Sequence, residues 1–340
     1  MKRIAILLVL LTFAVSFLSA GGGAEGVSGA EKVKSTVLRY AHVGVEGEDQ
    51  TIWVADFAAR VKEATSGRVE IQVYPNSQLG NLAEIIEGVR TGSIAMAHHT
   101  YSSLGNIVPA FSVFDGPYVY RDAAHALHAS SPYTSPVVRE LNEELVEKAG
   151  IRVIANFYRG ARHLSATIPV YGPSDLQGKK IRGIPVKVWL SMLEGMGAIP
   201  TPVEFAELTT ALMTGLVIGQ ENPLNTIYSA KLHEVQNYIM LTGHMQSVLV
   251  VFINDKVWKG ISAEDRKTIE AVAEEMGEVS LQRSEASFTE VKGKLEAEGI
   301  TFIDESAGLD NEAFRTRVLA KINQDFPDWI PYIEEIQKVK

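Results

Sequence analysis

The sequence predicts an α/β protein built from mainly parallel sheets with helices on both faces. Two observations carry this prediction. Strand-like and helix-like segments alternate from residue 37 onward, and the same alternation begins again near residue 152. The composition agrees, because 340 residues with 46% hydrophobic and 21% charged side chains can build a large core and more naturally form two domains than one.

The first half supplies two strand and helix pairs. Residues 37–43 alternate in polarity as a strand, and residues 53–61 carry a large apolar side chain at every fourth position, as one face of a helix does. The Thr-Ser-Gly stretch at 65–67 ends that helix. Residues 69–73 alternate again, and residues 82–89 have helical periodicity. Folds of this order present ligands at the carboxyl ends of their strands.

The second half repeats this pattern. Its predicted strands are residues 152–158, 180–184, 217–219 and 246–254. Its predicted helical segments are residues 189–196, 205–213 and 263–298, the last as two helices or one long kinked helix. Ser262 is placed to cap this last segment, with Glu264 and Asp265 in the positive first turn.

The N-terminus has the pattern of a secretory signal peptide. Lys2 and Arg3 precede an apolar run over residues 4–18, and Ser-Ala-Gly follows, which predicts cleavage after Ala20. A retained membrane anchor is the alternative, but the run is shorter than the roughly 20 residues that span a bilayer. Residues 21–36 are predicted to be a flexible tether. The expected location is therefore the periplasm.

Composition and missing motifs exclude several classes of function. The net charge of −9 contains no long block of like charge, so nucleic acid is not an expected partner. The chain has no cysteine, and it lacks the serine-elbow, zinc-helix and phosphate-loop motifs of common enzymes. Adjacent His98 and His99 could hold a metal, but they point to opposite faces of a strand and no carboxylate or third histidine lies nearby in the sequence, so no metal site is predicted. No cofactor is predicted either.

A series of motifs gives a more specific indication. They are Gly-Arg-Val at 67–69, Tyr-Pro-Asn-Ser-Gln-Leu-Gly at 74–80, Pro-Tyr at 117–118, Gly-Ala-Arg-His-Leu at 160–164, Pro-Ser-Asp-Leu-Gln-Gly-Lys-Lys-Ile-Arg at 173–182, Gly-Ala-Ile-Pro-Thr-Pro at 197–202, Ala-Leu-Met-Thr-Gly at 211–215 and Gly-Gln-Glu-Asn-Pro at 219–223. In order and spacing the chain resembles the substrate-binding proteins of tripartite ATP-independent periplasmic (TRAP) transporters, the dicarboxylate-binding-protein family. The resemblance covers about residues 37–335.

The resemblance implies a two-lobed periplasmic binding protein fold, type II-like, with crossing strands and a long helix near the C-terminus. The expected lobes are residues 37–160 with 245–298, and residues 161–244 with 299–340, the latter including the C-terminal helices.

The resemblance also assigns ligand contacts. It implies that Arg162 forms a paired salt bridge with a ligand carboxylate, that Arg182 adds a second contact, that Asn222 hydrogen-bonds to the same end of the ligand, and that Phe205 lines the pocket. The chemistry agrees, because a guanidinium stays charged and its planar fork matches a carboxylate.

Other site residues follow with less support from motifs. The segment from His98 to Tyr101 follows a strand and is expected to provide specificity contacts from the other lobe. Trp189 could flank a ligand or belong to the core, and His42 could be a contact or a buried neutral histidine. Residues 183–186 offer few polar donors, which favours a smaller or partly apolar acid over a heavily hydroxylated one.

The predicted function is therefore that of a non-catalytic solute-binding protein, expected to be monomeric, that captures a small organic acid and delivers it to a TRAP permease. Two alternatives remain open at this point. One is an exported enzyme acting on a small carboxylate, and the other is a partner that presents ligand to a sensor protein. The sequence does not identify the acid.

Overall fold

A computed structural model describes residues 35–340. The predicted signal peptide and residues 21–34 of the predicted tether lie outside the described residues. The last tether residue, Thr36, instead begins the first strand. Within residues 35–340, no helix combines the length and the apolar character needed to cross a membrane.

The described strands form one mixed sheet in the order β2-β1-β3-β8-β4-β7-β5-β6, with β9 beside β8. In chain order they are β1 (Thr36–Ala41), β2 (Val69–Tyr74), β3 (Met96–His99), β4 (Ile151–Ala166), β5 (Lys180–Gly183), β6 (Ile199–Pro202), β7 (Gly219–Asn222), β8 (Tyr238–Asn254) and β9 (Thr301–Ile303).

The predicted fold class is confirmed. Strands β1, β2 and β3 pair in parallel on one side, and β5, β6 and β7 pair in parallel on the other. The long strands β4 and β8 run antiparallel to each other through both halves and join them. This arrangement gives two α/β lobes linked by crossing strands, while the exact lobe boundaries stay a prediction.

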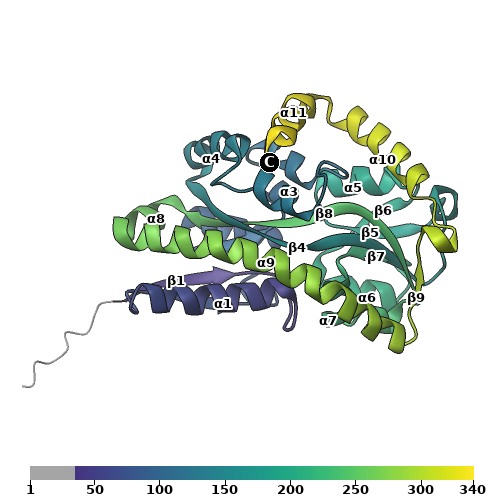
Figure 1. Ribbon diagram of the computed structural model, residues 1–340, viewed down its shortest axis with the longest axis horizontal. Helices are drawn as coiled ribbons and strands as arrows, with labels where there is room; N and C mark the ends of the chain where they lie inside the picture. The colour runs from purple at the N-terminus through teal and green to yellow at the C-terminus, as the bar shows by residue number, and fades with distance from the viewer. Residues whose placement is uncertain (1–34) are drawn as a thin grey trace, which may run out of the picture. The chain divides into compact units, whose positions relative to one another are not determined.

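Helices cover this sheet (Figure 1). They are α1 (Asp49–Ala64), α2 (Leu82–Thr91), α3 (Ala123–Ala129), α4 (Pro136–Ala149), α5 (Lys187–Gly195), α6 (Leu208–Met213), α7 (Leu224–Ser229), α8 (Asp255–Gly260), α9 (Ala263–Ala297), α10 (Asn311–Asp325) and α11 (Ile330–Lys338), with short 3-10 turns between some of them. Helix α9 is a single helix of 35 residues that packs along β4. The Ser262 hydroxyl caps it by accepting a hydrogen bond from the Asp265 amide, as predicted.

The second-half strands differ from their predicted ranges where polar residues are buried. Strand β8 begins at Tyr238, eight residues before the predicted start. Strand β7 covers Gly219–Asn222, later than predicted, and all four of its residues are buried. A buried strand normally reads as an apolar run. The polar residues of β7 hide this strand from a hydropathy pattern. They can be buried because Gln220 pairs with Ser165 and Glu221 with Arg162, both on β4.

The core fixes the first lobe against α9. Trp53 of α1 stacks between Phe57 and Phe157, with ring centroids 5.1 and 4.2 Å away. Its indole nitrogen donates to the Met276 carbonyl of α9 at 2.9 Å. Burial of a tryptophan requires such a partner for its N–H. The contact therefore ties α1, β4 and α9 together behind the site.

Candidate functional site

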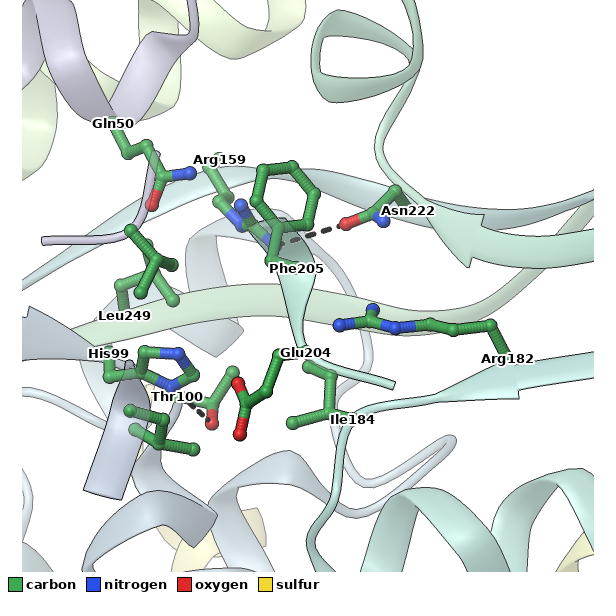
Figure 2. A pocket seen from close by; sticks show the side chains of 12 residues that line it. Gln50, His99, Thr100, Arg159, Arg182, Ile184, Glu204, Phe205, Asn222 and Leu249 are labelled. Carbon is green, nitrogen blue, oxygen red and sulfur yellow. Dashed lines mark hydrogen bonds between the residues drawn. The ribbon is translucent and has the colours of Figure 1, made fainter. Parts of the chain in front are cut away.

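A small cavity, partly open to solvent, lies where the crossing strands meet the ends of the parallel strands (Figure 2). Its walls come from both halves of the sheet. The lining residues are Val43, Gln50, Leu82, His99, Thr100, Arg159, Arg182, Ile184, Glu204, Phe205, Asn222 and Leu249. This is the position at which open α/β sheets bind ligands.

Arg182 of β5 is a buried cation that reaches into this cavity. Its exposed fraction is 3%, and its Nε donates to the Val203 carbonyl at 2.8 Å. The two terminal nitrogens form no hydrogen bond or ion pair within residues 35–340. Burial lowers the Arg182 pKa to about 10, so the guanidinium remains charged at neutral pH. Figure 2 shows the side chain extending toward the wall formed by His99.

Arg159 is a second buried cation, placed by an irregularity in β4. Tyr158 pairs with Val248 and Ala161 with Gln246, so two residues of β4 lie opposite Ser247 alone. Such a bulge turns Arg159 and Arg162 to the same side of the strand. The Ser247 hydroxyl accepts hydrogen bonds from Arg159 Nε at 3.1 Å and from Arg162 Nη1 at 3.5 Å.

Arg162 does not line the cavity. It is fully buried, its Nε donates to Glu221 Oε2 at 2.5 Å, and its Nη2 donates to Glu221 Oε1 at 2.9 Å. The guanidinium also lies over the Trp189 ring, 4.6 Å from its centroid. Burial acts to raise the Glu221 pKa, but Arg162 and a hydrogen bond from His244 lower it to about 2. The fork expected to hold a ligand carboxylate is thus occupied by a carboxylate of the protein.

Asn222 is held rigidly at the cavity wall by this ion pair. Its Oδ1 accepts from Arg162 Nη2 at 2.9 Å and from Arg159 Nη2 at 3.4 Å, and its Nδ2 donates to Gln220 Oε1 at 2.5 Å. Arg162 therefore acts on the cavity through Asn222. One further Nδ2 hydrogen stays available to a ligand.

The wall opposite Arg182 combines neutral and acidic groups. Burial lowers the His99 pKa to about 3, so this imidazole is neutral at neutral pH, and its Nδ1 lies 3.1 Å from the Thr100 hydroxyl. Gln50 is engaged with Glu48 and His98. Glu204 and Phe205 stand at the start of a 3-10 turn after β6, and both line the cavity.

Four other predicted site residues lie outside the cavity wall. His98 is buried between the Tyr40 hydroxyl and Gln50, at 2.9 and 3.1 Å, and the His42 ring stacks on it. The Tyr101 hydroxyl donates to the Ser130 carbonyl. Trp189 is buried and its indole nitrogen donates to the Ser102 hydroxyl at 3.0 Å. For these side chains direct ligand contact stays a prediction, and the cavity favours supporting roles.

No motif in the sequence points to Arg159, Thr100, Gln50 or Glu204, and His99 stands out only as a candidate metal ligand and as part of the His98 to Tyr101 segment. His99 and Thr100 fall inside the segment expected to give specificity, so the signal for them was present. Alternation along a regular strand puts residues 159 and 162 on opposite faces. The sequence therefore does not indicate that the bulge brings Arg159 to the same side as Arg162. Within the described part of the chain, no group of three acidic or histidine side chains could hold a metal ion.

Comparisons with known proteins show which proteins this chain is similar to. The family described as bacterial extracellular solute-binding protein, family 7, matches residues 40–326. The 2,3-diketo-L-gulonate-binding periplasmic protein of Escherichia coli is 30% identical over 302 residues, covering 88% of this chain and 90% of that protein.

Solved structures are similar over a comparable extent. A TRAP periplasmic solute-binding protein from Roseobacter denitrificans with bound L-galactonate has a TM-score of 0.82 and 28% identity, covering 90% of this chain and 100% of that one. One from Desulfovibrio desulfuricans with bound sn-glycerol-3-phosphate has a TM-score of 0.82 and 28% identity, covering 88% and 95%.

Proposed function

The chain belongs to family 7 of the bacterial extracellular solute-binding proteins, and from this membership we propose that it captures a small organic acid through Arg182 and Asn222. It is a binding protein and not an enzyme, and the role of its family is to deliver solutes to a TRAP-type secondary transporter.

The observation that carries the proposed contact is the state of Arg182. A guanidinium that is 3% exposed, with two terminal nitrogens directed into a cavity and free of protein partners within residues 35–340, needs an anion to repay its desolvation. A carboxylate fits, because its two oxygens match the two nitrogens of the fork.

Arg162 takes a positioning role in this proposal. Its charge is balanced by Glu221, and its hydrogen bond fixes the Asn222 side chain, whose Nδ2 donates to Gln220 and keeps one hydrogen for a ligand. The family resemblance implies that Arg162 holds the ligand carboxylate directly. The cavity lining supports Arg182 for that contact instead.

Similar proteins support an acidic ligand without identifying it. Their bound molecules include L-galactonate and sn-glycerol-3-phosphate, which share an anionic group at one end. Proteins of this family are periplasmic. We propose further that this protein acts as a monomer after cleavage of its signal peptide near Ala20, which N-terminal sequencing and light scattering of the secreted protein would test.

The proposal predicts that Arg182→Ala abolishes useful binding. Removing one member of a desolvated charge pair costs about 2–5 kcal/mol, or roughly thirty-fold to several thousand-fold in affinity. Calorimetry with L-galactonate and succinate would measure the loss. Arg60→Ala is the control, because Arg60 is an exposed arginine on α1 paired with Glu275. Affinity of Arg182→Ala within about threefold of wild type would contradict the proposal.

A further inference from the structure

The charged side chains in and behind the cavity include three arginines and three glutamates, and four of these six pair with each other. Arg162 is bound to Glu221 at 2.5 Å, and Arg159 Nη1 lies 3.8 Å from Glu48 Oε2. Arg182 and Glu204 are left, and neither forms an ion pair of 4.0 Å or less with any residue of the described chain. The cavity therefore presents one unpaired cation and one unpaired anion.

Glu204 is placed to contact a ligand. It directly follows Val203, whose carbonyl accepts from Arg182, and it precedes the 3-10 turn that begins at Phe205. Figure 2 shows its carboxylate inside the cavity, on the side of His99 and Thr100 and next to Ile184. It is half-buried and forms no side-chain hydrogen bond within residues 35–340. Burial raises its pKa, whereas the charge of Arg182 acts to lower it.

We propose that Glu204 determines ligand specificity by accepting a hydrogen bond from a hydroxyl or ammonium group on the ligand, at the end away from the carboxylate held by Arg182. This inference rests on the proposed function and narrows its ligand class. An ionised carboxylate accepts hydrogen bonds and has none to donate. It also repels a second carboxylate at short range, where little water screens the charges.

The groups next to Glu204 carry no positive charge, and Arg159, the other cation that lines the cavity, is already paired with Glu48 at 3.8 Å. His99 is neutral, Thr100 is engaged with His99, and Val43, Leu82, Ile184 and Leu249 are apolar. The preferred ligand class is therefore hydroxy acids and amino acids with one carboxylate, and unsubstituted dicarboxylates are disfavoured.

A matched series of acids tests this inference. Succinate, 4-hydroxybutyrate, 4-aminobutyrate and butyrate share one chain length and differ only at one end, and the five- and six-carbon series extend the comparison. Calorimetry should show wild type binding the hydroxy or amino acid at least tenfold tighter than the dicarboxylate of the same length. Comparison of the affinities for the hydroxy acid and the amino acid shows whether Glu204 accepts its hydrogen bond from a hydroxyl or from an ammonium group.

The decisive variant is Glu204→Gln, which keeps the shape and removes the charge. It should shift the ratio of donor-bearing acid to dicarboxylate by at least tenfold toward the dicarboxylate. Glu207→Gln is the matched control, because Glu207 is exposed at the end of the same turn and should leave the ratio unchanged.

The outcomes separate this inference from the proposed function. If Arg182→Ala loses all acids while Glu204→Gln changes the ratio by less than threefold, the role of Glu204 is overturned and the proposed function stands. Tighter binding of dicarboxylates than of hydroxy and amino acids by the wild-type protein also overturns the role of Glu204 and leaves the proposed function standing. Failure of every acid to bind wild type, or unchanged binding by Arg182→Ala, overturns both.

Discussion

The ion pair between Arg162 and Glu221 is the most buried charged contact near the cavity, with both side chains at 0% exposure. Charges at such depth are tolerated only when paired and hydrogen-bonded. Glu221 meets this condition through Arg162 and His244, and Arg162 through Glu221, Asn222 and Ser247. The stability of this region and the shape of the ligand site therefore depend on the same contacts.

We expect Arg162→Ala to lose stability as well as ligand affinity. It leaves the Glu221 carboxylate buried without its main partner, and breaking a buried ion pair costs about 3–5 kcal/mol of unfolding free energy. A side chain that only held the ligand carboxylate, which is the role that the resemblance implies for Arg162, could be removed without this loss of stability. Urea unfolding of the ligand-free protein measures the effect.

The double variant Arg162→Met, Glu221→Leu provides the control for that experiment. Removing both charges leaves no unpaired ion, so the double variant should be more stable than Arg162→Ala. If Arg162→Ala unfolds at the same urea concentration as wild type, the pair does not carry the stability assigned to it.

At the residue scale, the motifs in the sequence indicate which side chains lie near the site. They do not indicate what each of these side chains contacts. Arg182, Asn222 and Phe205 line the cavity, and their motifs gave that signal. Arg162 lies behind the wall because Glu221, two residues before the motif proline, takes its fork. Side-chain pairing between β4 and β7 is a long-range contact, and local spacing in the sequence does not contain it.

At the scale of elements, the bulge in β4 decides which arginines the cavity receives. Gly160 adopts φ of +109° there, a conformation that other residues enter only with strain. A side chain at this position would also meet the Ser284 hydroxyl at 3.1 Å. Glycine at 160 thus permits the extra residue opposite Ser247 that turns Arg159 into the site.

We expect Gly160→Ala to lower stability by about 1–3 kcal/mol and to weaken acid binding, because relief of the strain moves Arg159. Gly150→Ala is the matched control. Gly150 also has positive φ, +64°, but it ends α4, and a Cβ added there would meet no atom within 4 Å. Both variants should lose stability in urea unfolding, and only Gly160→Ala should lose affinity by calorimetry. Equal affinities for the two variants would show that the bulge does not position the ligand site.

The elements themselves were predictable in proportion to their hydropathy pattern. Strands β1 and β2 and helices α1 and α2 have regular periodicity and were placed correctly to within a few residues. The early part of β8 was missed because the polar residues Thr242 and His244, and Gly243 at positive φ, interrupt its alternation. These residues serve the network around Glu221, since Thr242 bonds His244 and His244 bonds Glu221.

At the scale of the whole molecule, hydrogen bonds link the two halves of the sheet beside the cavity. The Asp49 amide at the start of α1 donates to Asn225 Oδ1 of α7 at 2.9 Å, and the Thr226 hydroxyl donates to Glu48 Oε2 at 3.1 Å. The Ser229 hydroxyl donates to the Gly47 carbonyl at 3.0 Å. If the halves separate to admit a ligand, these are bonds that must break, so they bias the protein toward the closed arrangement.

The last prediction follows from this linkage. Thr226→Val keeps the side-chain shape and removes the hydroxyl that binds Glu48, so it destabilises the closed arrangement without touching the cavity wall. A hydrogen bond to a charged group contributes about 1–2 kcal/mol, which lowers affinity roughly five- to thirtyfold. The loss should be the same for every acid, because closure is common to all of them and cancels from any ratio of affinities. Thr214→Val is the control, since the Thr214 hydroxyl bonds only carbonyls of its own helix, α6.

Small-angle scattering should show wild type compacting when ligand is added, and Thr226→Val needing more ligand to reach the same radius of gyration. An unchanged radius for wild type at saturation, or a change in the ranking of acids in Thr226→Val, would mean that these bonds do not report closure.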